Sequence, residues 1–169
     1  MAPSQQQTFR LYLLRHAQAG WAEPGGRDFD RTLTEEGKSE AAFIGKSAVD
    51  RDYRPALMLS SAATRCRETA RIVLQAYDEK IAVSYFDEMY NARAEIYLDL
   101  ALRRDDVSSL MLVGHNPTIE AVAEVLLGRE LLETSLPHGF PTAGLAVLEC
   151  DLADKSRFRG WRLVDFLTP

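Results

Sequence analysis

The sequence predicts an α/β fold with a mostly parallel central sheet, and three observations support this prediction. Short apolar runs of strand length alternate with longer stretches of helical periodicity. Each of the first four runs leads through a turn of small or polar residues into a candidate helix, which is the order of βαβ units. The 169 residues are 46% hydrophobic and 27% charged, which is ordinary for one domain with a full core. We therefore predict a single domain over residues 1–169, in which residues 1–8 are flexible.

The predicted elements follow one another in a regular order along the chain. The apolar runs predict strands at residues 9–14, 56–59, 81–83 and 110–113. The helical patterns predict helices near residues 34–49, 62–76, 93–103 and 117–127. The last helix has the clearest start, with Asn116 as its N-cap and Pro117 at its first position. Its apolar face is formed by Ile119, Val122, Ala123, Leu126 and Leu127.

The pattern changes towards the end of the chain. Residues 143–150 and 159–166 predict two strands joined by a polar turn at residues 154–156, and we expect them to form an antiparallel element at the edge of the sheet. Residues 21–31 contain a proline and two glycines and predict a long irregular loop. Long loops in compact domains often carry function, so this loop is a candidate part of a binding site.

Charge, cysteine content and hydropathy exclude several classes of function. Lys and Arg number 20 against 25 Asp and Glu, so the net charge of −5 disfavours general binding to nucleic acid. No apolar run approaches the ~20 residues that cross a bilayer, so we expect no membrane span. The first residues lack a signal-peptide pattern, and Cys66 and Cys150 lie far apart in a chain too large to need disulfides. These features predict a reduced, cytoplasmic setting.

Arginine and histidine side chains follow the ends of three predicted strands. Arg15 and His16 end the first strand, Arg65 opens the helix after the second, and His115 follows the fourth. Because ligands in open α/β sheets bind at the carboxyl ends of parallel strands, we expect these four side chains to converge. His115 also directly precedes a helix N-terminus, whose free N–H groups and partial positive charge favour an anion. The sequence therefore predicts an anion site at this edge.

This constellation resembles the histidine phosphatase superfamily, whose first strand ends in Arg-His-Gly and whose second Arg and second His follow later strands. The short-chain phosphohistidine phosphatases of the SixA type are most similar, since the chain carries their four motifs in order. These motifs are residues 14–17, residues 28–34 with Gly37, residues 60–70 and residues 113–117. Ala17 replaces the common Gly, and Thr32 and Ala62 replace frequent prolines, without loss of a charged group. The resemblance implies a three-layer α/β/α sandwich of the phosphoglycerate mutase type with an open site.

The resemblance also implies a chemistry. His16 would attack phosphorus and form a phosphohistidine that water hydrolyses, while Arg15 and Arg65 hold the phosphoryl oxygens. His115 would donate to a phosphoryl oxygen, a role that favours its protonated form beside a dianion. No metal and no cofactor is expected, because these side chains supply the positive charge. The implied function is a metal-independent phosphatase acting on a phosphohistidine-bearing protein, and a small phosphomonoester is the alternative substrate.

Three further residues are candidates for the site. Glu88, after the third strand, and Asp28, in the long loop, could each be the general acid that an alcohol leaving group needs, and the sequence does not choose between them. Either could equally be a solvated surface carboxylate. Thr142 resembles a family position beside the phosphate, and an ordinary threonine at a strand start is equally consistent with the sequence.

Three other interpretations compete with this one. Residues 28–32 match the Asp-x-Asp-x-Thr signature of magnesium-dependent haloacid-dehalogenase-type phosphatases, although Asp28 does not end an apolar strand. A cysteine phosphatase would need an arginine six positions after Cys66, and that residue is Ile72. The chain could also be a module that binds phosphorylated ligands without turnover, although all four core residues are present.

Overall fold

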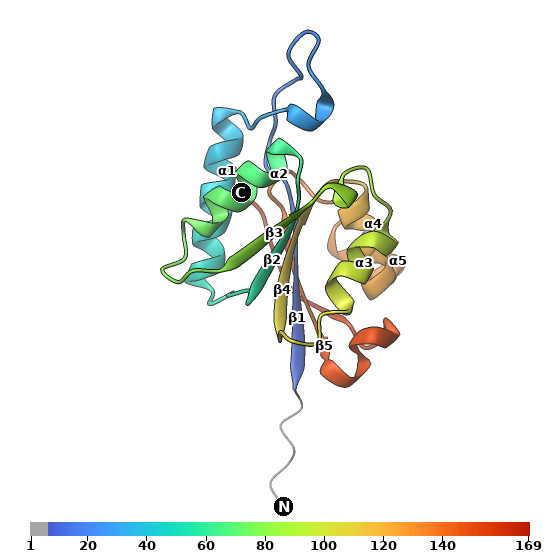
Figure 1. Ribbon diagram of the computed structural model, residues 1–169. Coiled ribbons are helices and arrows are strands. Elements are labelled where there is room, and N and C mark those ends of the chain that lie inside the picture. Colours follow the sequence, from blue (N-terminus) through green and yellow to red (C-terminus); the bar gives the residue numbers. More distant parts are fainter. Residues whose placement is uncertain (1–6) are drawn as a thin grey trace, which may run out of the picture.

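The computed structural model describes residues 7–169, which form a six-stranded sheet with helices on both faces (Figure 1). The strands are β1 (Thr8–Arg15), β2 (Leu57–Ser61), β3 (Ala82–Phe86), β4 (Ser109–Gly114), β5 (Leu145–Asp151) and β6 (Arg162–Leu167). Their spatial order is β3-β2-β4-β1-β5-β6. The pairs β2/β3, β2/β4 and β1/β4 are parallel, whereas β5 runs antiparallel to both β1 and β6. The predicted mostly parallel sheet with an antiparallel C-terminal element is therefore confirmed.

The central strands β1 and β4 are apolar on both faces because each face lies against a separate core. Alternate residues of a strand point to opposite faces, so Leu11 and Leu13 enter one core while Tyr12 and Leu14 enter the other. β4 is divided between the two cores in the same way. Continuous apolar runs of this kind are typical of parallel strands that are covered on both sides.

The helices form the two outer layers. α1 (Glu35–Asp50) and α2 (Thr64–Leu74) cover one face, and α3 (Ala94–Leu102), α4 (Thr118–Leu127) and α5 (Arg129–Ser135) lie on the other (Figure 1). Thr34 caps α1 by accepting a hydrogen bond from the Gly37 amide at 3.0 Å. The four predicted helices are thus present within two residues at each end, whereas α5 was not predicted, and the three-layer architecture is confirmed.

The predicted N-cap of α4 is wrong. Pro117, rather than Asn116, occupies the N-cap position, and the helix starts at Thr118. Asn116 Nδ2 donates to Glu120 Oε1 at 2.8 Å, while Oδ1, the atom that would cap the helix, has no hydrogen-bond partner among the described residues. The apolar face of this helix is as predicted, with Ile119 and Val122 fully buried.

Several short helical elements were not predicted from the sequence. Short 3-10 helices are formed by η1 (Asp28–Asp30), η2 (Asp87–Met89) and η3 (Leu152–Arg157), and the polar turn predicted at residues 154–156 lies inside η3. In η3 Lys155 is buried against the Phe9 ring and donates to the Arg104 carbonyl. Of the stretch predicted to be flexible, residues 1–6 lie outside the described residues. Thr8, the last residue of that stretch, pairs with Asp151 in the sheet.

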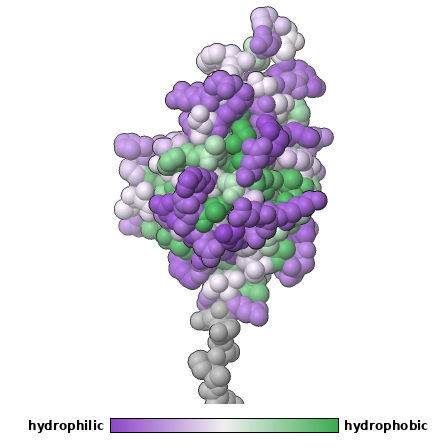
Figure 2. Space-filling model, turned by 90° about the vertical axis from the view of Figure 1, so that its left-hand side faces the viewer, coloured by the Kyte–Doolittle hydropathy of each residue, from purple (hydrophilic) through white to green (hydrophobic). Residues whose placement is uncertain are grey.

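The outer surface over α1 and α2 is mainly hydrophilic, with hydrophobic side chains lying between polar ones (Figure 2). Phe43 of α1, which is 53% exposed, is one of the larger apolar side chains that remain open to solvent. Scattered exposure of this kind is normal for a folded domain. Among residues 7–169, no helix combines the length and the apolar character that crossing a membrane requires.

Candidate active site

The four predicted side chains converge at the carboxyl ends of the parallel strands, which point to the top of Figure 1. Arg15 is the last residue of β1, and it pairs in register with Gly114, the last residue of β4. His16 and His115 each follow directly, and their ring centroids lie 5.4 Å apart. Arg65 comes from the first turn of α2, which follows β2. The parallel register is therefore what brings two histidines, separated by 99 positions (115 − 16), into contact.

The backbone before His115 packs closely on a buried tyrosine. A Cβ atom at Gly114 would overlap the Tyr97 side chain, so only glycine fits there without a shift of the strand end or of the ring. The Tyr97 hydroxyl donates to the Met89 carbonyl at 3.1 Å and lies 3.3 Å from the His115 amide, which donates to it. This contact sets the position from which the His115 side chain enters the site.

His16 is prepared to act as a nucleophile. Its Nδ1 lies 2.7 Å from the Ala17 carbonyl, which can only accept, so Nδ1 carries the proton and Nε2 keeps a free lone pair. The pKa of His16 is lowered to about 4, mainly by burial and to a smaller extent by the charges of Arg65 and Arg15, against an opposing effect of the Ala17 carbonyl. The Ala17 amide donates to Thr69 Oγ1 at 3.0 Å, which ties this turn to α2.

His115 is also neutral in this structure. It is 8% exposed, and burial, followed by the charge of Arg65, lowers its pKa to about 3. Its Nε2 lies 2.9 Å from Ser61 Oγ and 3.4 Å from Cys66 Sγ. If the Ser61 hydroxyl donates to Nε2, the single proton of the neutral ring sits on Nδ1, where it can be donated to an anion. The protonated form expected from the sequence is therefore not needed for His115 to act as a donor.

The two arginines offer buried donors. Arg15 Nη1 donates to the Phe140 carbonyl at 2.7 Å, and Arg65 Nη1 donates to the Asp28 carbonyl at 2.8 Å. The Nε–H groups of both arginines are buried and have no acceptor among the described residues. Each guanidinium also carries further N–H groups on its Nη atoms, and charged planar donors of this kind suit an anion. The four residues together can therefore bind and attack a phosphoryl group.

The structure separates the two candidate carboxylates. Asp28 Oδ2 accepts hydrogen bonds from the Tyr90 hydroxyl at 2.7 Å and from Arg65 Nη2 at 3.2 Å, and Oδ1 accepts from Arg31 at 3.0 Å. Tyr90, followed by Arg31, lowers the pKa of Asp28 to about 2. Glu88 is exposed on η2, and its side chain makes no hydrogen bond or ion pair with any residue in the range 7–169. Asp28 therefore borders the site as a carboxylate, not as an acid.

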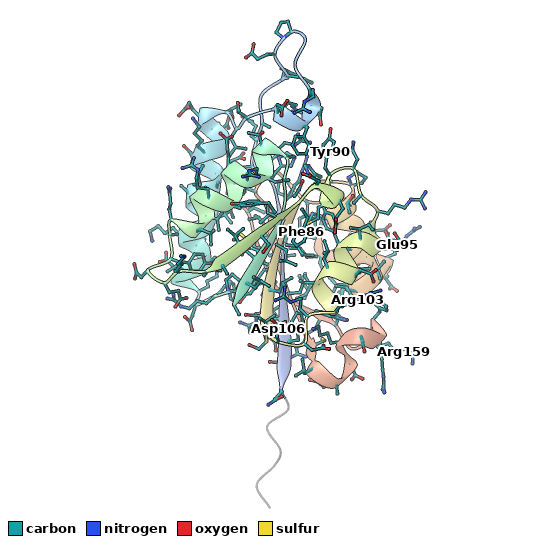
Figure 3. All side chains as sticks on the ribbon, viewed as in Figure 1. Phe86, Tyr90, Glu95, Arg103, Asp106 and Arg159 are labelled. Carbon is teal, nitrogen blue, oxygen red and sulfur yellow. The ribbon has the colours of Figure 1, made fainter. Side chains whose placement is uncertain are left out.

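Among residues 7–169, Thr142 makes no hydrogen bond with the four core side chains. Its hydroxyl donates to Glu40 Oε1 of α1 at 3.1 Å. Three contributors to the site were missed by the sequence analysis, namely Ser61, Tyr90 and the carbonyl of Phe140. Tyr90 lies two residues after Glu88 in the sequence. Figure 3 shows it just below η1.

The competing chemistries do not fit this geometry. Cys66 is fully buried, and burial raises the pKa of its thiol to about 12, so it is not a thiolate nucleophile. Asp28 belongs to the exposed segment η1 rather than to a buried strand end, which is where a haloacid-dehalogenase-type nucleophile would lie. Within residues 7–169, no group of three or more His, Cys, Asp or Glu side chains is placed to hold a metal ion.

Comparisons with known proteins agree with the fold. A crystal structure of a proposed phosphohistidine phosphatase SixA from Agrobacterium tumefaciens is 54% identical, with a TM-score of 0.87 over 95% of this chain and 98% of that chain. A phosphoserine phosphatase from Entamoeba histolytica, in complex with 3-phosphoglyceric acid, has a TM-score of 0.66 over 95% of this chain and 98% of that chain. At 16% identity it supports the fold alone.

A further relative extends the comparison beyond solved structures. A chloroplast protein of uncharacterised function from Arabidopsis thaliana is 31% identical over 140 residues, which are 77% of this chain and 64% of the Arabidopsis chain. This chain therefore matches less than two thirds of that relative's length. The sequence model of the histidine phosphatase superfamily (branch 1) matches residues 11–95, which include Arg15, His16 and Arg65. Together these findings support a hydrolase that acts on phosphoryl groups, and they show that this chain belongs to the histidine phosphatase superfamily, branch 1.

Proposed function

We propose that this protein is a metal-independent phosphatase with His16 as its nucleophile, and that its substrate is a protein carrying phosphohistidine. The observation that carries the proposal is a neutral His16 with a free Nε2, whose ring lies 5.4 Å from that of His115 and close to the charges of Arg65 and Arg15. The two guanidinium groups would hold the oxygens of a phosphoryl dianion. The same anion places phosphorus beside the nucleophile.

The reaction proceeds through two displacements at phosphorus. In the first, the lone pair of His16 Nε2 forms a bond to phosphorus while the leaving group departs with its own electron pair. The Nδ1 proton stays on the ring and continues to be donated to the Ala17 carbonyl, which stabilises the positive charge of the phosphorylated ring. In the second, water attacks phosphorus, the P–Nε2 bond breaks, and its electron pair returns to His16. Arg15, Arg65 and His115 hold the phosphoryl oxygens in both steps.

The choice of substrate and setting rests on two further observations. The SixA-type structure from Agrobacterium tumefaciens aligns over almost the whole of both chains, which favours a phosphohistidine substrate over a small phosphomonoester. Both cysteines, Cys66 and Cys150, are free and buried, which favours the reducing, cytoplasmic setting expected from the sequence. A small phosphomonoester remains the alternative substrate. The trapping and turnover experiment described next distinguishes it from a phosphohistidine protein.

The phosphorylated intermediate can be trapped. Rapid quenching of the enzyme with a ³²P-phosphohistidine protein is expected to leave a label on His16 that is stable in base and labile in acid. EDTA is expected to leave the yield and the turnover unchanged. Tight binding without label or phosphate release would favour a binding module, and a label on Asp28 would contradict the histidine mechanism. Faster turnover of simple phosphate esters than of the phosphohistidine protein would favour the small-molecule alternative.

The pH dependence of activity follows from the low pKa of His16. Protonation of Nε2 removes the attacking lone pair, so activity is lost only when the pH falls towards the pKa of about 4. We expect kcat/KM, corrected for the ionisation of the substrate, to stay level between about pH 8 and pH 5 and to fall below it. An unperturbed histidine, with a pKa of about 6.5, would lose activity below about pH 6.5. A decline that begins near neutral pH would contradict a buried, neutral nucleophile.

A further inference from the structure

Asp28 forms an anionic corner at the open side of the proposed active site. Three donors hold its carboxylate, the Tyr90 hydroxyl at 2.7 Å, Arg31 Nη1 at 3.0 Å and Arg65 Nη2 at 3.2 Å. The side chain nevertheless remains 51% exposed, so its oxygens can accept a further hydrogen bond from a ligand. The corner is joined directly to the phosphate-binding residues, because Arg65 belongs to both.

Aromatic side chains lie beside the Asp28 carboxylate. The Tyr90 ring lies 5.8 Å from the ring of His115 and 5.0 Å from the ring of Phe29, between centroids, and both pairs meet edge to face. The guanidinium of Arg65 lies over the Tyr90 ring at 5.9 Å. Tyr90 therefore places a half-buried aromatic ring beside His115, and a planar ring can pack against such a ring.

The corner lies on the side from which a leaving group departs. In an in-line displacement the leaving atom is opposite the attacking one, so it lies beyond phosphorus as seen from His16. His16 sits at the ends of the strands, and η1, which carries Asp28 and Phe29, lies beyond those ends in Figure 1. The group that leaves phosphorus therefore departs towards η1 and Tyr90.

We propose that Asp28 and Tyr90 form a leaving-group subsite that accepts a cationic imidazole ring, and this proposal rests on the proposed function. The ring packs against Tyr90, and the proton on the ring nitrogen that does not carry phosphorus is donated to the Asp28 carboxylate. The subsite recognises the chemistry of phosphohistidine itself, whichever protein carries it.

The subsite makes a general acid unnecessary for this substrate. The N-phosphorylated ring is cationic when its other nitrogen is protonated. When the P–N bond breaks, its electron pair stays on the leaving nitrogen, and a neutral imidazole departs with its remaining N–H still donated to Asp28. His16 Nε2 forms the new bond to phosphorus in the same step. An alkyl phosphate instead releases an alkoxide, which needs a proton that the Asp28 carboxylate does not carry.

The matched control lies on the same 3-10 segment. Asp30 is 50% exposed, nearly the same as Asp28, and its side chain pairs with Arg27 away from the four core residues. The variants Asp28→Asn and Asp30→Asn therefore remove equivalent charges, one inside and one outside the subsite. The readout is the ratio of kcat/KM for N-phosphorylimidazole to kcat/KM for phenyl phosphate, because a general loss of folding lowers both values together.

We expect Asp28→Asn to lower this ratio about tenfold or more and Asp30→Asn to leave it unchanged, since a charge-assisted hydrogen bond is lost only in the first variant. Equal losses on the two substrates would overturn the subsite and make Asp28 a structural tether of η1. Failure of the wild-type enzyme to form a phosphohistidine with either substrate would instead overturn the proposed function.

If Asp28→Asn does not fold, a second variant can still test the proposed subsite. Tyr90→Phe preserves the ring and removes the hydroxyl, the largest of the effects that lower the pKa of Asp28. The carboxylate stays charged at neutral pH, but it loses the donor at 2.7 Å that helps to orient it, so the ratio at pH 7 should fall, though by less than in Asp28→Asn. A ratio equal to that of the wild type would contradict a role for a positioned Asp28 carboxylate.

Discussion

Replacing His16 with alanine is expected to abolish turnover, with kcat lowered by at least about 10⁴-fold, because the variant lacks the atom that bonds to phosphorus. Burial and the Ala17 carbonyl keep His16 neutral, with Nε2 free. The other nearby histidine does not replace it, since Nε2 of His115 is engaged by Ser61. Phosphate release and the trapped label should therefore disappear together.

The third histidine provides a matched control for this variant. His138 is exposed in the loop before β5, so His138→Ala is expected to keep wild-type turnover. Circular dichroism and thermal unfolding would verify that His16→Ala retains the fold. Retention of about 1% of wild-type kcat or more, in a folded variant, would show that another group attacks phosphorus.

The second large effect is expected for Arg65→Ala, which should lower kcat/KM by about 10²- to 10³-fold. The substitution removes the guanidinium that faces the phosphoryl oxygens, and it also removes the partner of Asp28, at 2.8 Å to its carbonyl and 3.2 Å to its carboxylate. Both losses act on the same site, one on charge and one on the position of η1. Arg65→Lys should recover only part of the activity, because lysine keeps the charge without the planar pair of donors.

The control for Arg65 lies on the same helix. Arg67 is exposed and lies over the Tyr85 ring at 4.4 Å, and within residues 7–169 its side chain makes no hydrogen bond with the four core residues. We expect Arg67→Ala to retain turnover and the affinity for inorganic phosphate, measured by calorimetry, whereas Arg65→Ala should lose both. Equal phosphate affinity in the two variants would show that Arg65 acts only by holding η1.

Fold and core site residues could be predicted because they depend on local patterns. Alternating apolar runs and helical stretches predict a parallel sheet, and in such a sheet the residues that follow strands share one edge. These two patterns are sufficient to predict that four residues lie close together, namely Arg15, His16, Arg65 and His115. The predicted start of α4 was wrong because a capping preference is weak, and Asn116 Oδ1, the atom that would accept from the first helical amides, has no hydrogen-bond partner among residues 7–169.

The states of these side chains could not be predicted in the same way. The sequence does not show how deeply a histidine is buried. Burial is the largest cause of the low pKa values of His16 and His115. The choice between Asp28 and Glu88 depends on whether η1 folds over Arg65, a contact between residues 37 positions apart. The sequence did not indicate that Tyr90 belongs to the site, because an aromatic residue near a strand end is common.

The sequence by itself determined the family, the sheet and the four residues that meet at its edge, since each follows from order and spacing along the chain. Only the tertiary structure decided that both histidines are neutral, that Asp28 is a carboxylate among three donors, and that Glu88 stands apart in solvent. The reason is physical. Protonation and hydrogen bonding depend on what surrounds a side chain in space, and those surroundings come from distant parts of the chain.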